Sequence, residues 1–208
     1  MGVYTCSLPD KKHRREFSEV LAAQLGGSRP KGVQAYLCQE LQTAGQKEAA
    51  PALGKLLADE ELCAPAAMAL TAIGEGAAEQ FRAALPKTKE KCRLMCLQSL
   101  GVLRDAKSAG ALKQAVSDAD RDTRIIAAWG LGNIGDGAAA DLLLAASDKA
   151  QGWERIQHTK ACLLLAERLL AAGKKAESQK IYAHLQKTRS DPSERYIREA
   201  AEKALAAK

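Results

Sequence analysis

The chain has 208 residues, of which 47% are apolar, 27% charged and only 4% aromatic, and its net charge is +6. This composition excludes global disorder, and no apolar run is long enough for a membrane-spanning helix. Because so few rings are available, Ala and Leu must fill the core, which favours closely packed helices over a β-sandwich or barrel.

The N-terminal part of the chain carries no recognisable targeting segment. Residues 1–10 lack the apolar stretch of a secretory signal peptide. A helix is expected from Lys12 to Leu25, and the Gly-Gly-Ser-Arg-Pro run that follows ends it. We therefore divide the chain into a tail with an extra helix, residues 1–29, and a repeat array, residues 30–208. A cytoplasmic location is favoured, with a secreted or periplasmic one left open if a leader has been removed.

The cysteines give no metal or redox motif. Only Cys92 and Cys96 lie close together in the sequence, and a structural zinc site needs two further ligands. Most of the six cysteines fall on or near the apolar stripes of expected helices, where free Cys acts as a small apolar filler. This interpretation predicts free thiols and a reducing compartment.

A leucine recurs along the chain at intervals of 29, 30, 31, 38 and 36 residues. The six positions are Leu41, Leu70, Leu100, Leu131, Leu169 and Leu205. Counted from each leucine, the residues at −7, −4, −3, 0 and +3 share one face of a helix, and glycine often follows as a C-cap signal. A second apolar period precedes most of these helices, over Glu48–Leu57, Gly76–Leu85, Ser108–Val116, Gly137–Ala146 and Lys175–Leu185.

The fourth of these repeats carries the clearest family pattern. Its sequence, Asp-Arg-Asp-Thr-Arg followed by Ala-Ala-Trp-Gly-Leu-Gly-Asn-Ile-Gly-Asp over residues 120–136, resembles the HEAT-repeat consensus in its short HEAT-like, phycobilisome-lyase-type form. The last repeat, from Asp191, looks similar, and the resemblance covers roughly residues 30–208. It implies an all-α fold, a right-handed superhelical solenoid of about six stacked helix pairs, because one pair cannot bury both of its faces alone.

Two residue types within the repeats have structural interpretations. Arginine occupies position −7 as Arg93, Arg124 and Arg198, and we expect these side chains to join adjacent repeats, because the planar guanidinium can fix two bonds at once. Asp122 is expected to cap the helix that follows it by accepting its first N–H groups.

No motif in the sequence indicates catalysis. None of the three histidines is followed directly by glutamate, and the Gly130–Gly135 segment lacks the Lys-Ser/Thr of a phosphate-binding loop. We therefore expect no catalytic residue, no metal and no cofactor. Some HEAT-like proteins are bilin lyases, so a lyase acting on a bound tetrapyrrole remains an alternative that the resemblance suggests.

The second helix of each repeat lines the concave side in solenoids of this kind. Positions −5, −2 and +2 then face outward, and in the middle of the chain they are largely apolar, which is typical of interaction sites. The expected partner-binding residues are Tyr36, Met68, Met95, Gln98, Val102, Ile126, Trp129, Asn133 and Leu164. The sequence thus predicts a scaffold that binds a peptide or protein partner, with no oligomeric state assigned.

Nucleic-acid binding is the main alternative function. Residues 149–189 carry nine basic and three acidic side chains, and such a basic segment can attract phosphate groups. A solvated helical surface explains the same charge, so the two interpretations stay open at this point.

Overall fold

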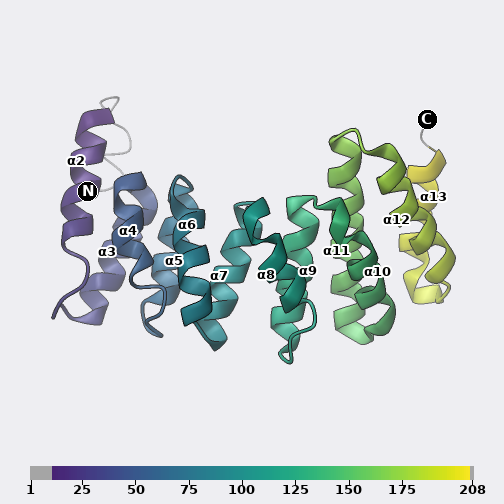
Figure 1. The fold of residues 1–208 in the computed structure, drawn as a ribbon, viewed down its shortest axis with the longest axis horizontal. Helices are drawn as coiled ribbons and strands as arrows, with labels where there is room; N and C mark the ends of the chain where they lie inside the picture. The colour runs from purple at the N-terminus through teal and green to yellow at the C-terminus, as the bar shows by residue number, and fades with distance from the viewer. Residues whose placement is uncertain (1–10, 207–208) are drawn as a thin grey trace. The chain divides into compact units, whose positions relative to one another are not determined.

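The computed structural model describes residues 11–206, and these residues form helices and no strand (Figure 1). The α-helices are α2 (Lys11–Ala23), α3 (Lys31–Ala44), α4 (Ala50–Gly54), α5 (Cys63–Ile73), α6 (Ala77–Ala84), α7 (Glu90–Val102), α8 (Ala109–Ala115), α9 (Arg121–Ile134), α10 (Ala140–Lys149), α11 (Gly152–Ala171), α12 (Lys175–Thr188) and α13 (Arg195–Ala206). The predicted all-α solenoid architecture is confirmed. The expectations made for residues 1–10, including Cys6, lie outside the described residues.

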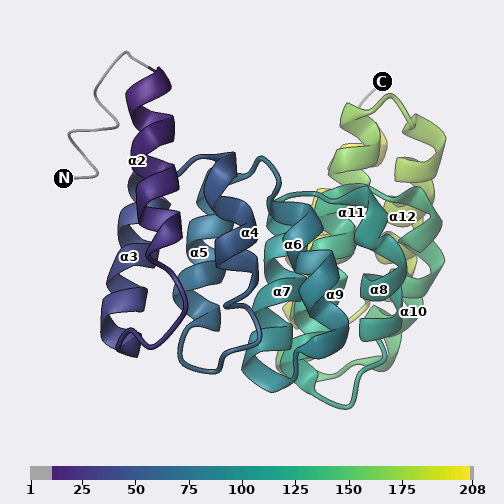
Figure 2. The same cartoon turned by 60° about the vertical axis from the view of Figure 1, so that its left-hand side comes forward.

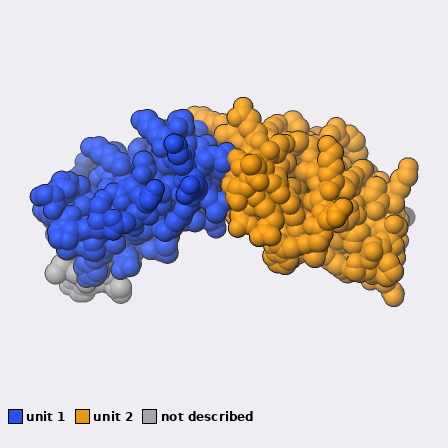
Figure 3. Space-filling model, turned by 90° about the horizontal axis from the view of Figure 1, so that it is seen from below, with its two compact units in different colours: residues 1–103 blue, residues 104–208 orange. Residues whose placement is uncertain are grey.

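The twelve described α-helices make six consecutive pairs, grouped into two compact units of three pairs each (Figure 3). Unit 1 is residues 1–103 and unit 2 is residues 104–208. In unit 1, α2, α4 and α6 form one layer, and α3, α5 and α7 form the other (Figure 2). The helix α2 therefore takes the same place in its pair as α4 and α6 take in theirs.

The core of each unit is built from the apolar stripe of each repeat, the helix face that carries the recurring leucine and positions −7, −4, −3 and +3 counted from it. In the second, third and fourth repeats, the residues at positions −4, −3 and 0 are all buried. They are Ala66, Ala67, Leu70, Cys96, Leu97, Leu100, Ala127, Ala128 and Leu131. Small side chains at −4 allow close packing of neighbouring helices, as the composition predicts.

The glycine that follows most stripes ends its helix in two different ways. Gly74 and Gly135 adopt positive φ values of 73° and 79°, and each donates its N–H to the anchor leucine carbonyl one turn earlier. Gly45 instead leaves the helix in an extended conformation. In the third repeat, Arg104 takes the place of glycine and still has a φ of 52°.

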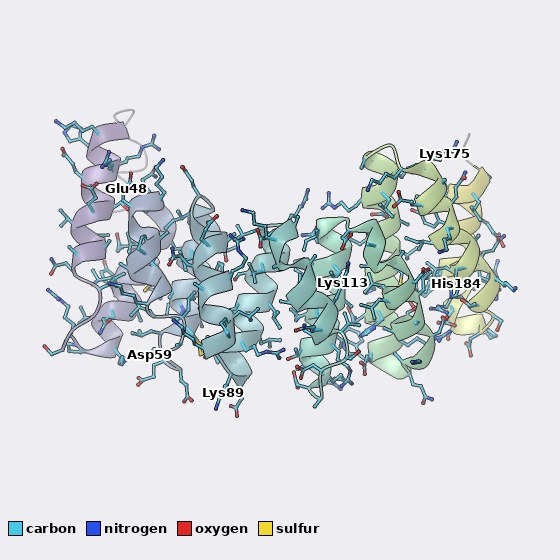
Figure 4. The ribbon with its side chains drawn as sticks, viewed as in Figure 1. Glu48, Asp59, Lys89, Lys113, Lys175 and His184 are labelled. Atoms are coloured by element: carbon cyan, nitrogen blue, oxygen red, sulfur yellow. A yellow bond between two sulfur atoms is a disulfide. The ribbon has the colours of Figure 1, made fainter. Side chains whose placement is uncertain are left out.

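The interpretation of all cysteines as free thiols is wrong for two of them. Cys63, the first residue of α5, and Cys92 on α7 form a disulfide with their Cα atoms 5.5 Å apart (Figure 4, yellow, near Asp59). The two positions are 29 residues apart, so equivalent turns of successive repeats bring them together. Cys38, Cys96 and Cys162 are free and buried, and burial raises the pKa of their thiols to about 11, 11 and 12.

Within residues 11–206, no helix combines the length and the apolar character needed to cross a membrane. The same residues contain no cluster of three His, Cys, Asp or Glu side chains arranged to hold a metal ion.

Candidate functional site

A groove lies on the second-helix layer of unit 1, between α5 and α7, with a contribution from α3. Its volume is about 500 Å³. The lining residues are Gln42, Ala67, Met68, Thr71, Ala72, Met95, Gln98, Ser99 and Val102. None of them carries a charge, although 27% of the whole chain is charged.

The groove contains four of the predicted partner-binding residues. Met68 and Val102 are 54% and 45% exposed, and Met95 and Gln98 are half-buried beside them. The fifth predicted residue of unit 1, Tyr36, is exposed on α3 but does not line the groove. These side chains offer apolar surface to a ligand together with amide groups that can pair with a peptide backbone.

Hydroxyl groups join the two walls at the floor of the groove. Thr71 on α5 donates to the Ala67 carbonyl at 2.7 Å, and its hydroxyl lies 3.0 Å from the Ser99 hydroxyl on α7. Thr71, Ser99 and Gln42 were not predicted, because only positions −5, −2 and +2, which follow the outer line of each helix, were considered. A groove between two helices also takes the positions that flank that outer line.

The remaining predicted partner-binding residues belong to unit 2. Ile126 and Trp129 on α9 and Leu164 on α11 are half-buried. The predicted partner-binding role of Asn133 is corrected, because Asn133 is only 8% exposed and its side-chain oxygen accepts a hydrogen bond from Arg168 Nη2 at 2.9 Å. Asn133 thus ties α9 to α11 and offers little surface to a partner. Two exposed apolar residues at the start of α11 were not predicted, namely Trp153 and Ile156.

The arginine at position −7 of the fourth repeat bridges two repeats of unit 2. Arg124 donates through Nε and Nη2 to the two carboxylate oxygens of Glu154 on α11, at 2.6 and 2.8 Å. Its Nη1 donates to the carbonyls of Asp118 and Ala119 in the preceding loop, both at 2.9 Å. We call this arrangement, in which one arginine binds a glutamate and two backbone carbonyls that precede its helix, a rung, and this first one the Arg124–Glu154 rung.

A second rung follows one repeat later. Arg155 on α11 makes a bidentate pair with Glu194, at 2.7 and 3.0 Å, and its Nη1 donates to the Ser147 and Asp148 carbonyls. Counting back from the anchor leucine missed Arg155, because α11 begins more than a turn earlier than the equivalent helices.

The contacts of Arg198 and Arg93, the other two arginines that were predicted to join repeats, differ from those of Arg124. Arg198 on α13 donates to the carbonyls of Arg189 and Ser190, which lie between α12 and α13, as Arg124 donates to its own loop and Arg155 to the last turn of α10. Arg93 lies half-buried on α7.

The predicted cap of α9 is wrong by two residues. Asp120, not Asp122, is the N-cap, and its carboxylate accepts from the Thr123 backbone N–H at 2.7 Å and from the Thr123 hydroxyl at 2.8 Å. These hydrogen bonds lower the pKa of Asp120. Asp122 lies within the first turn, exposed and paired with Arg121. An aspartate inside the first turn is too far along the helix to accept its first N–H groups.

The basic segment 149–189 uses part of its charge inside unit 2. Arg189 has no exposed surface and donates to Asp148 at 2.6 Å and to the Ser147 hydroxyl at 2.6 Å. Arg155 forms the second rung, and Lys180 pairs with Asp141. Other cations of the segment, such as Lys175 at the start of α12, lie on the surface (Figure 4).

Comparison with known proteins supports the repeat architecture. Residues 78–163 match the family model that describes HEAT repeats. This match contains α7 to α10 and most of α11, and with them parts of both units. It supports a HEAT-repeat relationship but not the phycobilisome-lyase subtype. No curated protein matches the sequence.

Proposed function

We propose that the protein is a non-catalytic scaffold that binds a peptide segment of a partner protein in the groove between α5 and α7. The observation that carries this proposal is the uncharged lining with two exposed apolar side chains, Met68 and Val102. Repeat solenoids of helix pairs present extended surfaces of this kind to their partners. The family match supports the same general role, since HEAT repeats commonly act in protein interactions.

The groove favours an extended, uncharged and partly apolar segment. Apolar side chains of the ligand would contact Met68, Met95 and Val102, while the Gln42 and Gln98 amides would pair with its backbone. A charged ligand side chain would lose hydration in the groove without gaining a counter-charge. In unit 2, Trp129, Ile126 and Leu164 form a second proposed contact surface.

The test is a screen of a displayed peptide library against the native protein and two variants. Met68→Asp with Val102→Asp places charge in the groove, and Val20→Asp is the matched control at an exposed position of α2. We expect uncharged, apolar peptides to be enriched, and the groove variant to bind them at least about tenfold more weakly while the control is unchanged. Enrichment that both variants retain, or no enrichment at all, would refute the groove as the binding site.

A further inference from the structure

A separate cavity of about 330 Å³ lies in unit 2 and is lined in part by the Arg124–Glu154 rung. Its walls come from the residues that follow α8 and from α9, α10 and α11. The lining residues are Val116, Ser117, Arg124, Leu142, Ala145, Ala146, Lys149, Ala150, Glu154 and His158. The volume lies at the lower end of the roughly 300–1,000 Å³ that natural ligand pockets occupy.

The cavity is lined by a buried polar side chain that has no hydrogen-bond partner among the described residues. His158 is only 2% exposed, and neither of its ring nitrogens makes a hydrogen bond. Glu154 on the same helix makes a loose ionic contact, with its Oε1 3.6 Å from His158 Nε2, which is beyond hydrogen-bond distance. A buried polar group normally has a partner, so an unsatisfied one beside a cavity points to a ligand.

The charges around the cavity favour an anion. Arg124 and Glu154 form a close bidentate pair and neutralise each other. Lys149 is exposed at the rim, and no carboxylate of the described residues pairs with it. Lys149 is thus a cation without a counter-charge among those residues, and its long side chain allows its ammonium group to turn toward the opening of the cavity.

We propose that this cavity binds a small organic acid, with the carboxylate held by Lys149 and His158 and the apolar chain lying against Val116, Leu142 and Ala146. The alanines at 145, 146 and 150 leave the space that such a chain would fill. This site is independent of the groove in unit 1, so either proposal can fail without the other.

The first experiment follows the histidine resonances by NMR while sodium hexanoate is added to the full chain. We expect saturable binding with a Kd of about 1 mM or tighter, and a shift of the His158 ring signals only. His13 and His184 are internal controls. Acetate lacks the apolar chain and hexanol lacks the charge, so both should bind at least about tenfold more weakly.

Variants then test the two parts of the site. Lys149→Met should weaken hexanoate binding about tenfold, whereas Lys187→Met, an exposed lysine on α12, should leave it unchanged. Ala146→Leu should fill the cavity and abolish binding, with the thermal melt showing that the fold persists. The proposal is overturned if hexanoate leaves His158 unmoved, if hexanol binds equally well, or if both lysine variants have the same effect.

The titration of His158 supplies a further readout. Burial lowers the pKa of His158, Glu154 opposes this, and Arg124 adds to it, while Lys149 is the other cation that lines the cavity. A bound carboxylate stabilises the imidazolium form, so hexanoate should raise the pKa of His158 and bind more tightly as the pH falls. A pKa that does not change on saturation with hexanoate contradicts a contact between the carboxylate and the ring.

Discussion

Arg104 follows the helix α7 in the place where four other repeats carry glycine, and it adopts a φ of 52°. A side chain with a Cβ is strained in this left-handed region, whereas glycine is not. We expect Arg104→Gly to raise the free energy of unfolding by about 0.5–1 kcal/mol, measured by urea denaturation. Arg104→Ala is the control, because it removes the same side chain and keeps the strain. An equal gain in both variants would show that the side chain, not the backbone, is responsible.

Gly132 illustrates a different need for glycine, namely close approach of two helices. A Cβ at this position would lie 2.6 Å from the Ala161 carbonyl oxygen on α11, so the two backbones would have to separate. We expect Gly132→Ala to destabilise the protein by about 1–3 kcal/mol. Gly110→Ala on α8 is the matched control, since no atom lies within 4 Å of its added Cβ. Its higher helix propensity should stabilise the chain by up to about 1 kcal/mol. Equal effects of the two changes in thermal melts would contradict this packing argument.

Sequence periodicity predicts which residues are buried but not which polar groups meet. The stripe around Leu131 is buried as expected, because its spacing alone places those residues on one helix face. The cap at Asp120 and the pairing of Arg155 with Glu194 depend on the residue at which each helix begins. That boundary shifts by one or two turns between repeats, and no sequence period records the shift.

The disulfide between α5 and α7 fixes one end of the two walls of the groove. Cys63 lies one turn before Ala67, and Cys92 one turn before Met95, and both of the latter line the groove. Closing a loop of 29 residues in the unfolded chain is worth about 3–4 kcal/mol. We expect Cys63→Ala with Cys92→Ala to lose that amount in non-reducing urea titrations.

The control for the disulfide is the same titration under a reducing agent. Once reduced, the native chain and the double variant should have similar midpoints, since neither then carries the link. Non-reducing peptide mapping should recover the Cys63 and Cys92 peptides joined. Free thiols at both positions in the native protein would contradict the link.

The Arg124–Glu154 rung and His158 both contribute to the response of unit 2 to acid. Burial lowers the pKa of His158 below its ordinary value of 6.5, so the unfolded chain takes up a proton more readily than the folded one. Stability is therefore full above pH 6.5 and falls as the pH drops through and below that value. The hydrogen bonds from Arg124 also lower the pKa of Glu154, which adds a second loss below about pH 4.5.

The variant His158→Leu tests the first of these two stages. Leucine has no proton to gain, so we expect its melting temperature to change less than that of the native chain between pH 7.5 and 5.5. His13→Gln is the control, because it removes an exposed histidine from α2, which belongs to unit 1. A native melting temperature that is the same at both pH values would refute a buried, neutral His158.

At the scale of the whole molecule, the repeat period predicts the architecture, and the site emerges only from packing. Six stripes and the preceding apolar periods predict a stack of helix pairs, which is what both units contain. The groove depends on which side chains of neighbouring helices happen to be small. Ala67, Ala72 and Ser99 leave room between Met68 and Met95, and their combined effect is a property of two packed helices.

The net charge of +6 makes nucleic-acid binding an alternative to peptide binding. The two can be told apart because their affinities respond differently to salt. A protein with six to ten phosphate contacts loses about a thousandfold or more in affinity between 50 and 200 mM salt. The groove lining is uncharged, so the affinity for a peptide selected on it should change less than about twofold over that range. Fluorescence anisotropy with that peptide and with a labelled DNA duplex measures both. Lys174→Gln with Lys175→Gln removes two surface cations and should affect only the duplex. Tight, strongly salt-dependent binding of the duplex, lost in that variant, would instead favour the basic segment as the functional surface.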